Sequence, residues 1–118
     1  MEFLALIHAD EGVWDRMSDD ERNAAYEQYG EFTQAVRSAG VFVHGNELGP
    51  TSAATTVRIR EGKQLVSDGP YAEVKEALGG YYILECPSFD DAVDWAARIP
   101  AASHGAVEVR PVHVDEEA

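Results

Sequence analysis

Six short apolar segments predict six β-strands along the chain. The first, residues 3–8, is apolar at both parities, with Phe3 and Ile7 on one face and Leu4 and Leu6 on the other. A strand that is apolar on both faces is covered on both sides. The other predicted strands are residues 41–48, 55–60, 64–67, 80–85 and 107–114, and a turn at residues 61–63 joins two of them into a hairpin.

Two helical patterns lie between these strands. Ser18 and Glu21 have the spacing of a capping box, in which each side chain binds the other residue's backbone N–H. Apolar residues at helical spacing follow until Gly40 ends the pattern. Ser88 is a candidate N-cap for a second helix, which Pro100 ends.

The order of these elements predicts a ferredoxin-like α+β fold. It reads β-α-β, a hairpin, then β-α-β, which forms one antiparallel sheet with both helices on the same face. Two helices leave the other face of the first strand uncovered. We therefore expect a homodimer, in which a second subunit packs against the open face around a shared cavity.

Composition narrows the class of protein. The 118 residues fit one domain, residues 1–118, whose end, residues 115–118, is read as a solvated acidic tail. There are 22 Asp and Glu against 9 Lys and Arg, a net charge of −13. That balance argues against nucleic acid and anionic membranes as partners, because both require concentrated positive charge. No apolar run approaches the ~20 residues of a membrane span, and the N-terminus lacks a signal peptide's basic start. We expect a cytoplasmic protein.

Several spaced motifs resemble the YCII-related family, in its DGPF-domain branch. They are residues 68–76 (Asp-Gly-Pro-Tyr-Ala-Glu-Val-Lys-Glu), 79–82 (Gly-Gly-Tyr-Tyr), 95–100 (Trp-Ala-Ala-Arg-Ile-Pro), Gly105 and 108–111 (Glu-Val-Arg-Pro). Tyr71 stands where the branch name has Phe. The resemblance implies a ferredoxin-like fold in the dimeric α+β-barrel superfamily, which includes muconolactone isomerases and small monooxygenases that need no metal. Most members of the family have no assigned reaction, and some relatives are encoded beside extracytoplasmic-function sigma factors.

Asp68 is the first candidate for acid/base chemistry. It ends a strand before Gly-Pro, so its carboxylate is fixed where the chain turns. The alternative is that it only accepts hydrogen bonds from the turn. Glu73 and Lys75 follow closely and are candidates for ligand binding, with a solvated loop as their alternative.

Arg110 is the candidate anion-binding residue. Glu108 and Arg110 share one face of the last strand, and Val107 and Val109 share the other. If the valines face the helices, Arg110 faces the open side and can bind a substrate carboxylate bidentately. The alternative is an ion pair with Glu108 or with the other subunit.

His8 and two aromatic residues complete the candidate set. On the open side, His8 would be a general base near neutral pH, although a histidine at a strand end is also commonly structural. Tyr82 and Trp14 suit the wall of a pocket for a flat organic ligand, or else belong to the core. No spacing completes a metal site, and no phosphate-binding loop is present, so we expect no metal and no cofactor.

Two functions fit these residues. The first is the binding of a small organic, anionic molecule in a pocket at the dimer's sheet face, with cofactor-independent acid/base chemistry of the isomerase or lyase kind. There Asp68 or His8 would be the base. The alternative is a non-catalytic regulatory or ligand-sensing partner linked to an extracytoplasmic-function sigma factor. Whether the protein is an enzyme is left open.

Overall fold

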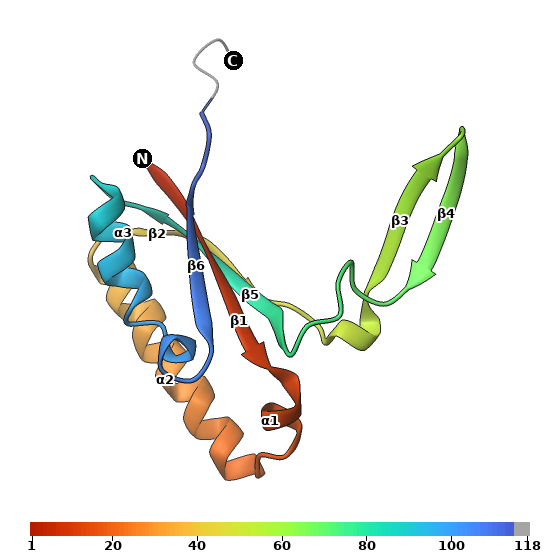
Figure 1. Cartoon of the computed structure of the whole chain (residues 1–118). Helices are drawn as coiled ribbons and strands as arrows, with labels where there is room; N and C mark the ends of the chain where they lie inside the picture. Colours follow the sequence, from red (N-terminus) through yellow and green to blue (C-terminus); the bar gives the residue numbers. More distant parts are fainter. Residues whose placement is uncertain (115–118) are drawn as a thin grey trace.

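A computed structural model describes residues 1–114, and the predicted tail at 115–118 lies outside them. Four strands form an antiparallel sheet in the order β2-β5-β1-β6, with helices on one side (Figure 1). The strands are β1 (Glu2–Asp10), β2 (Phe42–Glu47), β5 (Glu76–Glu85) and β6 (Ala106–Pro111). The order and the single helical layer confirm the ferredoxin-like α+β fold.

The helices begin at the predicted caps. Ser18 accepts a hydrogen bond from the backbone N–H of Glu21 at 3.1 Å, and the Glu21 carboxylate accepts one from the Ser18 N–H at 3.0 Å. Ser88 caps the second long helix in the same way, from the Asp91 N–H. The helical segments are α1 (Glu11–Asp15), α2 (Asp19–Ser38), α3 (Phe89–Ala96) and the 3₁₀ turns η1 (Thr51–Ala53) and η2 (Pro100–Ser103).

The core lies between this helical layer and one face of the sheet. Phe3, Ala5 and Ile7 are buried there, whereas Leu4 and Leu6 on the other face of β1 are only half-buried. Their opposite neighbours follow the same alternation: Val107 and Val109 of β6 pack against the core. We call the surface that carries Leu4 and Leu6 the open face.

The hairpin leaves the sheet altogether. Strands β3 (Thr55–Arg60) and β4 (Lys63–Asp68) pair only with each other and project from the end of the sheet (Figure 1). Glu61 and Gly62 connect them, with φ values of 53° and 74°. Two consecutive residues with positive φ give the right-handed twist that a tight hairpin needs. We call residues 55–68 the arm.

One helix and several element boundaries differ from those predicted. Helix α1 was not expected, because its five residues are too short to show a periodic pattern. Strand β5 begins at Glu76 rather than at Gly80, since Gly80 pairs with Ile7 and Gly79 lies at a register irregularity that does not end the strand. Strand β6 ends at Pro111, short of 114, and α3 ends at Ala96, before Pro100. Within residues 1–114, no helix is both long and apolar enough to cross a membrane.

Candidate functional site

A groove of about 560 Å³ lies between α2 and the sheet. Its walls carry the aromatic side chains Trp14, Tyr26, Tyr29, Phe42 and Tyr82. Pockets for small molecules have volumes of roughly 300–1,000 Å³ and are mostly apolar with a few polar groups. This groove, which we call the α2 groove, therefore has the size and the lining of a binding site for a small organic molecule.

Tyr82 forms a rigid wall of the groove. Its ring is buried and packs edge-on against Phe32, with ring centroids 5.1 Å apart. Its hydroxyl is 2.9 Å from the hydroxyl of Thr33 on α2, so the polar end is satisfied. Gly45 on the neighbouring strand makes room for the ring, because a Cβ at that position would lie 2.7 Å from it.

Helix α1 positions Trp14 at the other wall. Asp10 caps this helix through the Gly12 N–H, and Glu11 accepts a hydrogen bond from the Thr51 N–H at 2.9 Å. Arg22 of α2 donates to the backbone oxygen of Trp14 at 3.0 and 3.1 Å. Trp14 also packs edge-on against Tyr26, with centroids 5.3 Å apart. The indole is thus held from both sides.

The polar groups of the groove include phenols and several carboxylates, together with Gln28, Thr33, Arg37 and His104. Burial raises the pKa of Tyr29 above its ordinary value, and burial together with Glu47 raises the pKa of Tyr26. Both phenols therefore stay protonated near neutral pH and can donate hydrogen bonds. Arg37 also lines the groove, but its guanidinium lies 4.5 Å from the centre of the Phe42 ring.

Residues 69–75 follow the arm and carry part of the family motif, so we call them the motif loop. They form a smaller concavity. Gly69, Pro70 and Glu73 line it together with Thr51 and Ser52 of η1, around a volume of about 330 Å³. Glu73 and Lys75 are exposed. Asp68 is the last residue of β4 and is exposed as well. This loop is a shallow, solvent-facing surface.

The open face carries Arg110, as the alternation predicted, and also His8, whose face the alternation had left open. His8 shares it with Leu4 and Leu6, and its Nε2 lies 3.5 Å from a carboxylate oxygen of Glu108. Arg110 is opposite Leu4 in the neighbouring strand. An ion pair between Glu108 and Arg110, one of the alternatives considered for Arg110, does not form in the described part of the chain, and Glu108 contacts His8 instead. Within residues 1–114, the Arg110 guanidinium makes no hydrogen bond or ion pair, so its donors are available to a ligand.

A second polar cluster on the open face was not foreseen. Asn46 Nδ2 is 3.0 Å from His44 Nε2 and 3.4 Å from the Tyr81 hydroxyl. His44 and Asn46 are two residues apart on β2 and therefore share a face. This spacing is the sequence signal for the cluster. Their meeting with Tyr81 depends on the β2–β5 register and on its irregularity between Phe42 and His44.

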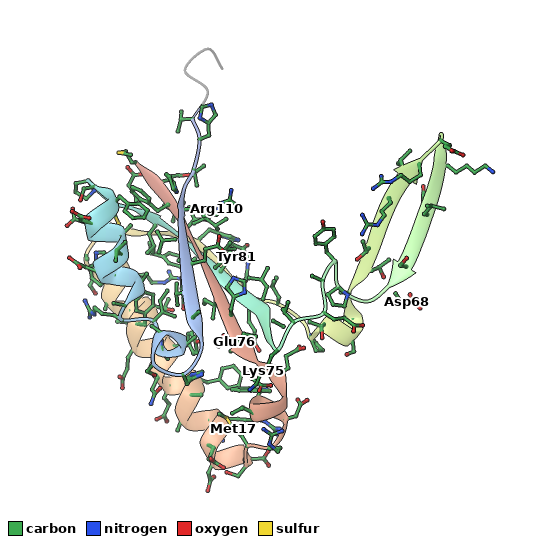
Figure 2. All side chains as sticks on the ribbon, viewed as in Figure 1. Met17, Asp68, Lys75, Glu76, Tyr81 and Arg110 are labelled. Carbon is green, nitrogen blue, oxygen red and sulfur yellow. The ribbon has the colours of Figure 1, made fainter. Side chains whose placement is uncertain are left out.

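The candidate residues lie in three places. His8 and Arg110 are on the open face, and Tyr82 and Trp14 line the α2 groove on the other side of the sheet. Asp68 is at the base of the arm, across the molecule from Arg110 (Figure 2). A single chain therefore does not bring Asp68 together with His8 or Arg110.

Cys86 offers no reactive thiol, and no group of metal-ligating side chains was found within residues 1–114. Burial raises the pKa of the Cys86 thiol, which keeps it protonated and unreactive. Among residues 1–114, no three His, Cys, Asp or Glu side chains are grouped to hold a metal ion.

Comparisons with known proteins agree with the geometry of a small α+β domain. An uncharacterized protein of Rhizobium meliloti (strain 1021) is 36% identical over 114 residues, which is 95% of this chain and 92% of that protein. The family model for the YCII-related domain matches residues 1–114. This chain belongs to the YCII-related domain family.

Proposed function

We propose that this protein binds a small, flat organic molecule in the α2 groove. The observation that carries this proposal is a groove of about 560 Å³ whose aromatic walls are fixed from several elements. Trp14 is held by α2, and Tyr82 is held by Thr33 and by the space at Gly45. Rigid aromatic walls bind a planar molecule at a small cost in side-chain entropy. Tyr26 and Tyr29 supply neutral hydrogen-bonding groups.

Two adjacent alanines on α2 provide a test. Ala25 lines the groove, whereas its neighbour Ala24 is exposed and does not. Ala25→Phe should therefore fill the groove, and Ala24→Phe is the matched control on the same helix. A thermal-shift screen of small aromatic compounds first identifies a binder. At ~100 times its Kd, a ligand adds about 2.7 kcal/mol to the free energy of unfolding.

The binder should stabilise the wild type and Ala24→Phe equally, and leave Ala25→Phe unchanged. Quenching of Trp14 fluorescence should accompany binding, since the indole lies at the site. Equal stabilisation of all three proteins would place the ligand outside the groove.

A second candidate site is the open face, in a homodimer. The contact of His8 with Glu108 favours it, because a carboxylate orients an imidazole for proton transfer. Arg110, two positions after Glu108 on β6, would anchor an anionic group. Asp68 at the end of the arm, and Glu73 and Lys75 of the motif loop, would complete the site. Such a site supports isomerase- or lyase-like chemistry without a cofactor.

Turnover separates this chemistry from a regulatory role. Chromatography with mass spectrometry, which separates an isomer of equal mass by its retention, should reveal product after incubation if the site is catalytic, and His8→Gln should abolish that product. Saturable binding without product supports the alternative, a ligand-sensing partner of an extracytoplasmic-function sigma factor. In that case the protein and the sigma factor should co-elute in gel filtration.

A further inference from the structure

The arm exposes a row of apolar side chains. Val57, Ile59 and Val66 are 57%, 59% and 55% exposed, although Val57 and Val66 are opposite each other in the hairpin. An isolated two-stranded hairpin is at best marginally stable in water. Since β3 and β4 pair only with each other, another surface must cover this row for the arm to keep its shape.

The two faces of the arm differ in charge. Alternation puts Val57, Ile59 and Val66 on one face and Arg58, Arg60 and Lys63 on the other. Three of the chain's 9 cationic residues thus lie within six positions of a protein with a net charge of −13. The arm thus has an apolar strip on one face and long cationic side chains on the other, which can reach around its edges.

The open face has the complementary pattern. Its centre is apolar, with Leu4, Leu6 and Ile83 on neighbouring strands. Five carboxylates share this face around that centre: Glu2, Asp10, Glu76, Glu85 and Glu108. Glu85 contacts the N-terminal amine at 2.7 Å, Glu108 contacts His8 and Asp10 caps α1, so within residues 1–114 Glu2 and Glu76 are the carboxylates of this face that have no partner.

We infer that the arm of one protomer docks on the open face of a second copy of this chain. Its apolar strip would cover Leu4, Leu6 and Ile83, and its cations would meet the surrounding carboxylates. Each copy carries both an arm and an open face. Reciprocal docking therefore buries two arms and two open faces in a closed two-fold dimer. The inference rests on the homodimer proposed above and specifies how it forms.

Docking of the arm would also enclose the second candidate site. His8 and Arg110 lie on the surface that the partner's arm would cover, beside Leu4 and Leu6. Asp68 ends the arm and the motif loop follows it directly, so both would be carried to the same surface. Asp68 of one protomer would then meet His8 and Arg110 of the other, which a single chain does not achieve.

Light scattering of arm variants tests this inference. Val57→Thr, Ile59→Thr and Val66→Thr together remove the apolar strip but keep β-branched side chains that favour strands. Leu65→Thr is the control, because Leu65 is similarly exposed but lies on the cationic face. At a concentration where the wild type has about twice the 12.9 kDa chain mass, the triple variant should be monomeric and Leu65→Thr dimeric.

The outcomes separate the inference from the proposed dimer. A monomeric wild type would reject both the homodimer and the docking of the arm. A dimeric wild type with an equally dimeric triple variant would reject the docking alone. Circular dichroism checks that the four-stranded sheet, which does not include the arm, is retained in every variant.

Cross-linking locates the surface that the arm contacts. A benzophenone group attached at Ile59→Cys reports its neighbours, and buried Cys86 is protected from labelling. The labelled protein is mixed with a ¹⁵N-labelled wild-type copy. Cross-links should join the arm to ¹⁵N peptides from β1 and β5. The inference would be overturned if the cross-links stayed within one copy, if they joined the arm to the helices, or if none formed.

Discussion

At the residue scale, the turn after Asp68 does not depend on the Asp68 carboxylate. Gly69 adopts a φ of 106°, and its N–H donates to the Ala54 oxygen at 2.8 Å. The Thr56 hydroxyl donates to the Gly69 oxygen at 2.9 Å. Within residues 1–114, the Asp68 carboxylate makes no hydrogen bond. The structural explanation for an aspartate here, acceptance of turn hydrogen bonds, therefore loses support.

Replacing Asp68 should leave the fold intact. Asp68→Asn and Asp68→Ala should both stay within ~0.5 kcal/mol of the wild type in free energy of unfolding, as substitutions at exposed sites commonly do. Urea denaturation measures this. If an open-face ligand or substrate is found, both changes should weaken its binding or turnover. A loss of stability above ~1 kcal/mol in Asp68→Ala alone would restore the structural explanation.

Arg110 should act through the geometry of its guanidinium. It is unpaired in residues 1–114, so a bound carboxylate would use its two parallel N–H donors. Arg110→Lys keeps the charge but loses that geometry, and should cost ~1–3 kcal/mol in binding of an anionic ligand. Calorimetry measures the difference. Arg98→Lys is the control, because Arg98 lies over Trp95 on the helix side; equal effects at both positions would remove the anchor role.

At the scale of elements, the sequence predicted what local pattern determines. The capping box, the strands and the outward direction of Glu108 and Arg110 follow from short-range periodicity and were confirmed. The α2 groove and the His44–Asn46–Tyr81 cluster were not predictable as units. Both depend on how distant elements pack, and on a register irregularity that alternation along one strand cannot reveal.

Helix α2 should depend on its N-terminal cap. Few of its residues are buried, and its first turn carries the acidic residues that favour this end of a helix. Ser18→Ala removes a cap and should cost ~1 kcal/mol of stability. Ser38→Ala, at the other end of α2, loses only an exposed bond from Gln34 and should cost less than ~0.5 kcal/mol. Urea unfolding compares the two, and equal losses would contradict a special role for the cap.

At the scale of the whole molecule, the chain is flat and extended. Its extents are 50 × 48 × 17 Å, and the helical layer, the sheet and the arm follow one another across the broad plane (Figure 1). The radius of gyration is 16.4 Å, against about 13–14 Å for a compact domain of this length. The projecting arm accounts for the excess. One face of the sheet and the apolar strip of the arm are left uncovered in this shape, which is what the proposed homodimer would explain.

Charge should therefore decide how tightly two copies associate. Arg60→Glu with Lys63→Glu reverses two arm cations that would meet the carboxylates of the partner's open face. Arg16→Glu with Arg98→Glu is the control, since both residues are exposed and lie off the arm and the sheet. Each pair of changes takes the net charge from −13 to −13 − 4 = −17, so general repulsion between copies rises equally.

The arm pair should weaken the dimer by ~1–2 kcal/mol more than the control pair, or about tenfold in Kd, from two exposed ion pairs. Analytical ultracentrifugation at low salt measures both constants. The difference should shrink between ~0.01 M and ~1 M salt, as the Debye length falls from ~30 to ~3 Å. Equal weakening by the two pairs at every salt concentration would mean that only net charge matters, and that the cations of the arm do not face the carboxylates of the partner.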